Sequence, residues 1–179
     1  MGGTVKNWVG TNTVGTYGNK HCGNVGVTDN SDVQWISGQA YGSSIYVGNA
    51  TGSRADVVEA GIPAVGAAYW YSGATTYEKS SQVVLSTDAS IWWDDANDWC
   101  DAGDGAGWWQ LHLISFQRSG ACDTRPGDSG APFYVRYAHT PYPQIGIRGM
   151  VTAVVGNTCF GEKWPRIQSL LGGVSISTN

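Results

Sequence analysis

Short apolar stretches separated by glycine, serine, threonine and asparagine run along the whole chain. Several of these stretches are rich in β-branched and aromatic residues, which favour extended strands over helices. We predict strands over residues 33–36, 82–85, 109–116, 131–137 and 144–155. Many short strands joined by glycine-containing turns are typical of a β-sandwich or a β-barrel.

One segment near the end of the chain has helical spacing instead. Its apolar residues fall on one helical face: Trp164, Ile167, Leu170 and Leu171. Pro165 suits a first helical turn, and the two glycines at 172–173 are suited to ending a helix. We therefore predict one short helix here, followed by a closing strand over residues 174–176.

The composition excludes several classes of partner. Of the 179 residues only 13% are charged, and the net charge is −4. Ten lysines and arginines cannot build a basic face, so we expect no nucleic-acid partner. No apolar run approaches the roughly 18 residues of a membrane-spanning helix, so we expect no membrane partner. No C-x-x-C pair is present, and we expect neither a metal nor a cofactor.

Four cysteines bear on where the protein works: Cys22, Cys100, Cys122 and Cys159. An even number of cysteines in a glycine-rich β chain favours two disulfides and an exported, extracellular protein, although the first residues do not have the pattern of a signal peptide. The alternative is four buried thiols in a cytosolic protein.

The run that carries chemistry is Gly127-Asp128-Ser129-Gly130, with Cys122 before it and a predicted strand after it. A serine hydroxyl becomes a nucleophile when a base takes its proton, and the resulting oxyanion needs preorganised N–H donors. Gly127 tolerates unusual backbone angles and leaves its amide open. Alone, such a tetrapeptide is also a common turn.

In this context the run resembles the serine loop of trypsin-like serine peptidases, above all those of the secreted bacterial streptogrisin and α-lytic type. Residues 30–36, 63–66, 72–76, 149–159 and 173–176 also resemble stretches of that family. The resemblance implies an all-β fold of two six-stranded Greek-key barrels of the chymotrypsin type, with a short C-terminal helix. Residues 1–60 would form the remainder of a truncated first barrel, and residues 61–179 the second.

The resemblance also implies roles for individual residues. Ser129 would be the nucleophile, Asp32 the carboxylate that orients the histidine, and Gly127 and Ser129 the oxyanion-hole donors. The family pairs the cysteines that match Cys122 and Cys159, which leaves Cys22 and Cys100 for a second pair.

The order of the family's triad requires a histidine before Asp32, and only His21 precedes it. The family places first-barrel strands between these two residues, and eleven residues are too few, so we do not assign His21 as the base. His112 is expected on a strand face and His139 in a loop. We expect the chain to begin just downstream of the base, through truncation or a misassigned start codon; a naturally inactive relative is the second explanation.

Departures from the family pattern bear on specificity. Ala153, Val154 and Val155 align with a substrate-binding strand that usually carries glycines, so we predict a narrowed pocket for a small apolar residue. Asp123 offers an alternative, a pocket that prefers a basic residue before the scissile bond. Tyr71 stands where bacterial members keep an arginine near the aspartate that matches Asp128, and its hydroxyl is available to bond that carboxylate.

The segment 91–109 holds five tryptophans and five aspartates and has no family counterpart. A solvated insertion, a substrate-contacting loop and a calcium site are the three interpretations of it.

We therefore predict a secreted, monomeric serine endopeptidase that acts on proteins or peptides through an acyl-enzyme on Ser129, weak or inactive in this chain. The alternative is a catalytically dead module that uses the same fold to bind peptide or glycan. A third interpretation is a glycine- and tryptophan-rich lectin in which residues 127–130 form only a turn.

Overall fold

The computed structural model describes residues 4–6, 13–21, 33–37, 43–49, 52–93, 108–137, 143–173 and 175–176. For residues 4–6, 13–21 and 33–37 it describes the course of the main chain. Four residues singled out above lie outside the described residues: Cys22, Asp32, Cys100 and His139.

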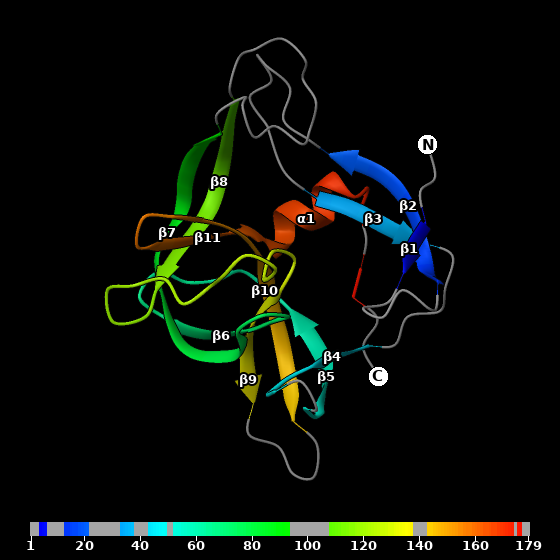
Figure 1. The fold of residues 1–179 in the computed structure, drawn as a ribbon, viewed down its shortest axis with the longest axis horizontal. Helices are drawn as coiled ribbons and strands as arrows, with labels where there is room; N and C mark the ends of the chain where they lie inside the picture. Colours follow the sequence, from blue (N-terminus) through cyan, green and yellow to red (C-terminus); the bar gives the residue numbers. More distant parts are fainter. Residues whose placement is uncertain are drawn as a thin grey trace.

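Six strands form a closed barrel in the second part of the chain (Figure 1). They are β6 (Ala68–Gly73), β7 (Tyr77–Trp93), β8 (Trp108–Gln117), β9 (Pro132–Tyr137), β10 (Gln144–Val155) and β11 (Thr158–Lys163). Their order is β11-β8-β7-β6-β9-β10, and pairing between β10 and β11 closes the ring. All six neighbouring pairs are antiparallel, and the predicted six-stranded barrel is confirmed.

The long strand β10 also connects the barrel to earlier parts of the chain. The first half of β10 pairs in parallel with β5 (Arg54–Ala60), and the second half pairs with β11. The short strand β4 (Ser44–Tyr46) lies antiparallel on β5 and ends the eight-stranded sheet. The predicted boundary after residue 60 thus falls between β5 and β6.

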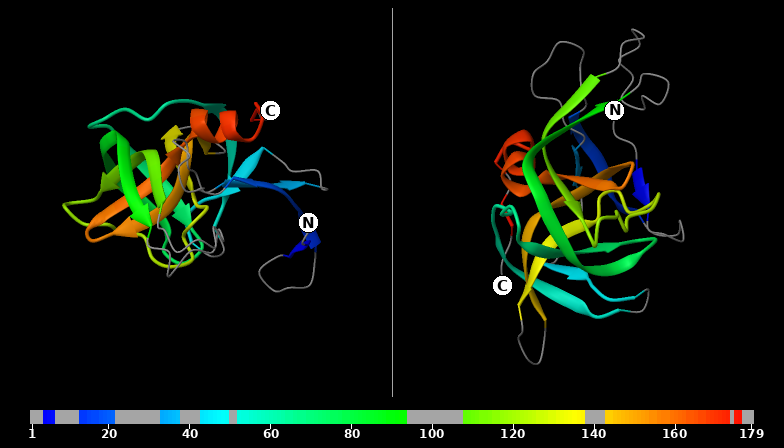
Figure 2. Two further views of the ribbon diagram at one scale, coloured as in Figure 1. Left: turned by 90° about the horizontal axis from the view of Figure 1, so that it is seen from above. Right: turned by 90° about the vertical axis from the view of Figure 1, so that its left-hand side faces the viewer.

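A separate antiparallel sheet of three strands lies to one side of the barrel (Figures 1 and 2). Its strands are β1 (Thr4–Lys6), β2 (Thr13–His21) and β3 (Val33–Ser37). In the described part of residues 1–60 these strands do not close into a second ring. The expected truncation of the first barrel stays a prediction.

The barrel interior is filled by aromatic side chains from alternate positions of its strands. Along β6 the inward residues Tyr69 and Tyr71 are buried between more exposed neighbours, as the two-residue period of a strand requires. Tyr69 lies 5.1 Å from Phe133 and Phe116 lies 4.7 Å from Phe133, measured between ring centres. These rings, with Val84, form the core against which the serine loop packs.

The predicted helix is confirmed as α1 (Trp164–Leu170), with Pro165 in its first turn and Ile167 buried. Gly172 and Gly173 adopt positive φ and follow the end of the helix. The predicted closing strand is wrong, since Ser175 and Ile176 lie outside any strand. Ile176 instead packs against the core beneath β4 and β5, so burial of its apolar side chain explains the pattern without a strand.

Among the described residues, no helix is both long and apolar enough to cross a membrane.

Candidate active site

The serine loop runs between β8 and β9, and its last residues, Ser129 to Ala131, are hydrogen-bonded to β10. The Ser129 hydroxyl is at the surface and donates to the carbonyl of Thr152 at 3.1 Å. Next to it, the Gly130 amide donates to the Val151 carbonyl, and the Val151 amide donates to the Ala131 carbonyl, both at 2.8 Å. Three bonds to one strand therefore fix the position of the serine.

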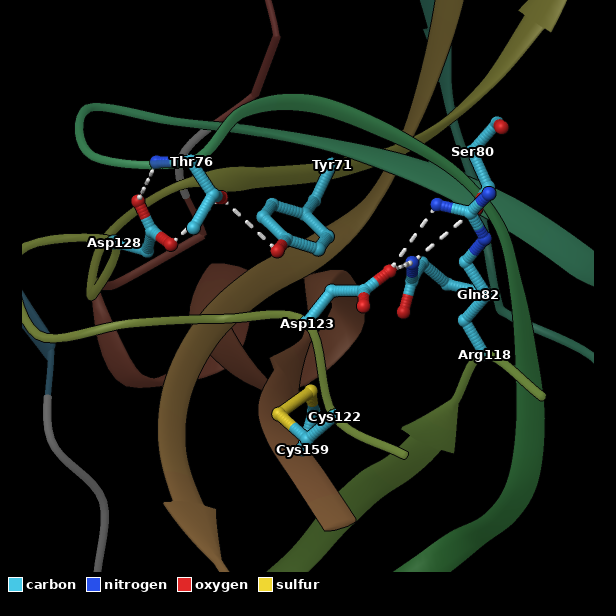
Figure 3. Close-up of polar contacts among 9 residues, drawn as sticks. All are labelled: Tyr71, Thr76, Ser80, Gln82, Arg118, Cys122, Asp123, Asp128 and Cys159. Carbon is cyan, nitrogen blue, oxygen red and sulfur yellow. Dashed lines mark hydrogen bonds and ion pairs between the residues drawn. A yellow bond between two sulfur atoms is a disulfide. The ribbon is translucent and has the colours of Figure 1, made fainter. Parts of the chain in front are cut away.

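A disulfide anchors the start of the loop. Cys122 is bonded to Cys159 on β11, with their Cα atoms 5.1 Å apart (Figure 3). This confirms the pairing that the family resemblance implied. The bond closes 37 residues, which include the serine loop, β9 and β10.

The Asp128 carboxylate is the second anchor, and it ties the loop to the turn between β6 and β7 (Figure 3). Asp128 is only 1% exposed. One oxygen accepts from the amides of Thr75 and Thr76 at 2.8 and 3.0 Å. The other accepts from the Thr76 hydroxyl at 2.8 Å and from the Arg125 amide at 2.9 Å. Four donors therefore compensate the buried charge without any cation.

These bonds decide the protonation of Asp128. Burial alone would raise the pKa of the carboxyl, because it disfavours the charged form. The hydrogen bonds from Arg125, Thr76 and Thr75 outweigh burial and hold the pKa below its ordinary value of 3.8. Asp128 is therefore an ionised anchor at neutral pH.

Glycine is required at two positions around this anchor. Gly127 has φ +96°, and a Cβ there would lie 2.5 Å from the Thr75 hydroxyl oxygen. Gly73, on β6, faces Asp128 so closely that a Cβ would collide with the carboxylate. The close approach of the loop to the β6–β7 turn thus depends on the absence of both side chains.

Tyr71 takes part in this anchor indirectly. We expected its hydroxyl to bond the Asp128 carboxylate, but it lies 3.0 Å from the Thr76 hydroxyl, which in turn donates to Asp128 (Figure 3). Burial raises the pKa of Tyr71 to about 12, against the opposing effect of the Thr76 bond. Sequence reasoning gave Thr76 no role of its own, although Thr76 lies in the stretch 72–76 that resembles the peptidase family.

Between Gly127 and Ala131, two amides have no acceptor in the described part of the chain: those of Gly127 and Ser129. The intervening Asp128 amide donates to the Arg125 carbonyl at 3.0 Å, and the Ala131 amide donates to the Asp128 carbonyl at 2.9 Å. The Gly127 and Ser129 amides are therefore available to an acceptor from outside, and their predicted oxyanion role stays a prediction.

A cavity of about 250 Å³ opens beside Ser129. Its lining consists of Trp93, Thr124, Arg125, Pro126, Asp128, Ser129, Val151, Thr152, Ala153 and Val154. Of the predicted substrate segment, Ala153 and Val154 line this cavity, whereas Val155 is exposed and outside the lining. Thr152 and Trp93 were not anticipated, although Thr152 directly precedes the predicted segment. A larger cavity, about 400 Å³ between β4, β10 and α1, contains Gly130 but not Ser129 in its lining.

Asp123 does not contribute to the cavity beside Ser129. Its carboxylate accepts from the Gln82 amide at 3.2 Å and from the Arg118 guanidinium at 3.4 Å (Figure 3). The only carboxylate in the lining is that of Asp128, whose oxygens are already hydrogen-bonded. The described residues therefore give the alternative of a basic-residue preference no support.

The two histidines within the described strands lie on different sheets. His21 ends β2, and its main chain is the register partner of Val33 on the adjacent strand β3. His112 is on β8, exposed, with φ 60°, and its Nδ1 lies 2.6 Å from the Asp88 carboxylate. His112 is absent from the cavity beside Ser129. Asp32 lies outside the described residues, so its predicted role stays a prediction.

No protein-family model and no curated protein sequence matches the chain. Solved structures of bacterial serine proteases do match it, each over 94% of this chain. A glutamic-acid-specific serine protease has a TM-score of 0.60 at 19% identity, over 77% of its own length. The chymotrypsin of Cellulomonas bogoriensis has a TM-score of 0.60 at 20% identity, over 78%. Protease A of Thermobifida fusca has a TM-score of 0.61 at 16% identity, over 76%.

The chain therefore has the fold of the chymotrypsin-like serine proteases, with β6–β11 as the closed barrel that carries the serine loop.

Proposed function

We propose that this chain is a serine endopeptidase domain that forms its acyl-enzyme on Ser129. One arrangement carries the proposal: an exposed serine hydroxyl lies beside a cavity, in a loop whose Gly127 and Ser129 amides have no acceptor. The saturated Asp128 carboxylate and the disulfide hold that loop in place. Preorganised donors of this kind stabilise the developing oxyanion because they need no reorganisation during the reaction.

In the proposed reaction, the Ser129 oxygen attacks the scissile carbonyl carbon and loses its proton to a base. The carbonyl oxygen takes the negative charge and is bound by the Gly127 and Ser129 amides. The C–N bond then breaks, the amine leaves with a proton from the base, and water hydrolyses the ester. Asp32 is proposed to orient the base.

The base itself limits the rate that we expect from this chain. We do not assign it to His21, which lies on the strand directly paired with β3 and not several strands before Asp32. Nor is His112 a candidate, because it is bonded to Asp88 and lies outside the cavity lining. We therefore expect Ser129 to react slowly in the chain as it stands.

The cavity beside Ser129 is proposed to receive the side chain before the scissile bond. Ala153 and Val154 supply apolar walls, and the one carboxylate in the lining is that of the fully bonded Asp128. A small apolar side chain fits such a lining better than a cation, which would be buried without a counter-charge. The proposed partners are therefore proteins or peptides with a small apolar residue at that position. The proposal includes export of a monomeric chain, which the disulfide supports.

Phosphonylation by a fluorophosphonate probe tests the proposal. We expect slow, stoichiometric labelling of the wild-type chain, abolished by Ser129→Ala and unchanged by Ser169→Ala on α1. Because the missing element is a base, added imidazole should raise the labelling rate at least tenfold. Labelling that survives Ser129→Ala would contradict the assignment of the nucleophile. Rapid labelling abolished by His21→Ala would show instead that His21 is the base.

A glycan-binding role has one observation in its favour. Trp92 and Trp109, paired across β7 and β8, are 51% and 50% exposed, with ring centres 5.3 Å apart. Exposed aromatic rings are suited to stacking on sugars. Titration with hexaoses of glucose, mannose and N-acetylglucosamine tests this role. Binding that is lost in Trp92→Ala and Trp109→Ala, in a chain that no fluorophosphonate labels, would favour the binding module.

A further inference from the structure

A row of buried polar side chains crosses the barrel wall behind the cavity beside Ser129. The indole N–H of Trp93 donates to the Gln110 side-chain oxygen at 2.9 Å. The Gln110 amide nitrogen donates to a Glu162 carboxylate oxygen at 2.8 Å. The other Glu162 oxygen lies 3.3 Å from the guanidinium of Arg166, on α1. The row therefore links β7, β8, β11 and the helix.

The hydrogen bonds of the row all run in one direction, from the Trp93 donor through Gln110 to the Glu162 acceptor. An indole nitrogen is only a donor and a carboxylate is only an acceptor, so Gln110 can bridge them in just one orientation of its amide. Gln110 and Glu162 are both 0% exposed. Water therefore cannot replace either partner without entering the barrel wall, and the indole is held in the plane that the amide oxygen sets.

Trp93 is the one member of the row that also lines the cavity. Its ring packs against a small core cluster of Ile91, Leu113, Ala153 and Phe160. Ala153 belongs to that cluster and also lines the cavity, as Trp93 does. A larger residue at 153 would compete with the indole for the same space.

A buried carboxylate–guanidinium pair is costly to desolvate, and apolar residues of similar volume are often at least as stable. Its presence here is therefore poorly explained by stability alone. What the row achieves, and apolar packing would not, is a fixed orientation of one cavity wall.

We propose that Trp93 is the specificity-determining wall of the cavity, and that Gln110 and Glu162 are positioning residues that hold its indole. This rests on the proposed function, because it takes the cavity as the site for the side chain before the scissile bond. With the indole in place the cavity accepts alanine and excludes phenylalanine. Loss of the indole, or of its orientation, admits the larger side chain.

Product binding tests this in the full chain without requiring catalysis. Two N-acetylated tetrapeptide acids serve as probes, one ending in alanine and one in phenylalanine, with alanine at the other positions. Binding is followed by NMR of the chain labelled with ¹⁵N in its tryptophan indoles, and Trp93→Phe identifies the Trp93 signal. We expect the alanine peptide to bind at least tenfold more tightly than the phenylalanine peptide and to shift that signal.

Variants at these positions distinguish the role of Trp93, as the cavity wall, from the role of Gln110 and Glu162, which hold its indole. Trp93→Ala should reverse the preference by at least tenfold. Gln110→Leu should weaken the preference several-fold and expose the Trp93 indole N–H to solvent exchange. Glu162→Gln combined with Arg166→Met keeps an oxygen for Gln110, leaves no unpaired buried charge and should retain the preference. If Gln110→Leu does not fold, Trp93→Phe serves as the test of orientation instead. It keeps an aromatic ring but deletes the N–H donor, so it should weaken the preference for the alanine peptide.

An unchanged ratio of the two dissociation constants in Trp93→Ala would overturn the inference and leave the proposed function intact. Failure of both peptides to bind the wild-type chain would also overturn it. Phosphonylation of Ser129 then decides separately whether the proposed function stands.

Discussion

Two carboxylates are buried in the described part of this barrel, and they are compensated in different ways. Asp128, 1% exposed, accepts from three main-chain amides and one hydroxyl. Glu162, 0% exposed, accepts from a side-chain amide and pairs with the Arg166 guanidinium. The first arrangement fixes a loop, because its donors belong to the main chain. The second fixes side chains, because its partners are side chains.

The difference matters for the proposed chemistry. Asp128 adjoins Ser129 and joins the serine loop to the β6–β7 turn, so it governs where the nucleophile and the two free amides lie. Glu162 acts at a distance, through Gln110, on the Trp93 wall of the cavity. In this account Asp128 controls the reactivity of Ser129, and Glu162 controls the selectivity of the cavity. Substitutions at the two residues can test the two roles separately.

Removal of Glu162 should have the largest effect on stability. Glu162→Ala leaves the Arg166 side chain, only 8% exposed, without its counter-charge. We expect a loss of about 3–5 kcal/mol in the free energy of unfolding, measured by guanidinium denaturation. The control Glu162→Gln, combined with Arg166→Met, removes both charges and should cost much less. Equal losses in the two variants would contradict the buried-pair account.

Substitution of Asp128 should cost slightly less but should affect the nucleophile. Asp128→Asn places an amide nitrogen where the carboxylate accepts from two donors, so at least one main-chain amide loses its acceptor. We expect a loss of about 2–3 kcal/mol in unfolding free energy and slower phosphonylation of Ser129. Glu162→Gln combined with Arg166→Met, by contrast, leaves no unpaired buried charge and should leave the phosphonylation rate unchanged. An unaltered rate in Asp128→Asn would contradict the role of the anchor.

The Asp128 contribution should also depend on pH. Its pKa in the folded chain lies below the ordinary 3.8, so folding favours the ionised form. The resulting stability is fully present above pH 3.8 and is lost as the pH falls through the lower folded-state value. The stability difference between the wild type and Asp128→Asn should therefore shrink below pH 4, as measured by urea denaturation at each pH. A difference that stays constant from pH 6 to pH 2 would contradict an ionised anchor.

Substitutions at two loop glycines should have the smallest effects on stability, and they test how closely the serine loop packs against the β6–β7 turn. Gly127→Ala combines a positive φ with a Cβ 2.5 Å from the Thr75 hydroxyl. Gly130→Ala has a similar φ, +86°, but no atom within 4 Å of the added Cβ. We expect about 1 kcal/mol of destabilisation at Gly130 and about 2 kcal/mol at Gly127, from thermal unfolding. Equal costs would show that the loop can move away from Thr75.

Local pattern was sufficient for much of the fold. The strands over residues 109–116, 131–137 and 144–155 and the helix at Trp164 follow from runs of apolar residues and from proline and glycine signals. The strand β7 was recognised only at residues 82–85, because polar residues alternate or cluster along the rest of its 17 residues. The strands β5 and β6 mix charged, small and aromatic residues, and pairing within the sheet, not local propensity, makes them strands.

The candidate site likewise has a part that the sequence shows and a part that only the folded chain shows. The motif around Ser129 was visible in the sequence because its residues are contiguous. Thr76 lies 52 positions from Asp128, and Gln110 lies 52 positions from Glu162, so no local signal connects them. The predicted substrate segment, residues 153–155, overlaps a cavity lining that on β10 runs from Val151 to Val154. Which residues of a strand border a cavity depends on the folded register, which no local pattern fixes.

The most direct test of the central claim is the mass of the intact chain after rapid mixing with the p-nitrophenyl ester of N-acetylalanine. Attack by Ser129 displaces p-nitrophenolate and leaves an acetylalanyl ester on the chain. We predict a burst of one p-nitrophenolate per chain, accelerated by imidazole, with the acyl group on the peptide that contains Ser129. Acylation that persists in Ser129→Ala, or none even with imidazole, would contradict Ser129 as the nucleophile.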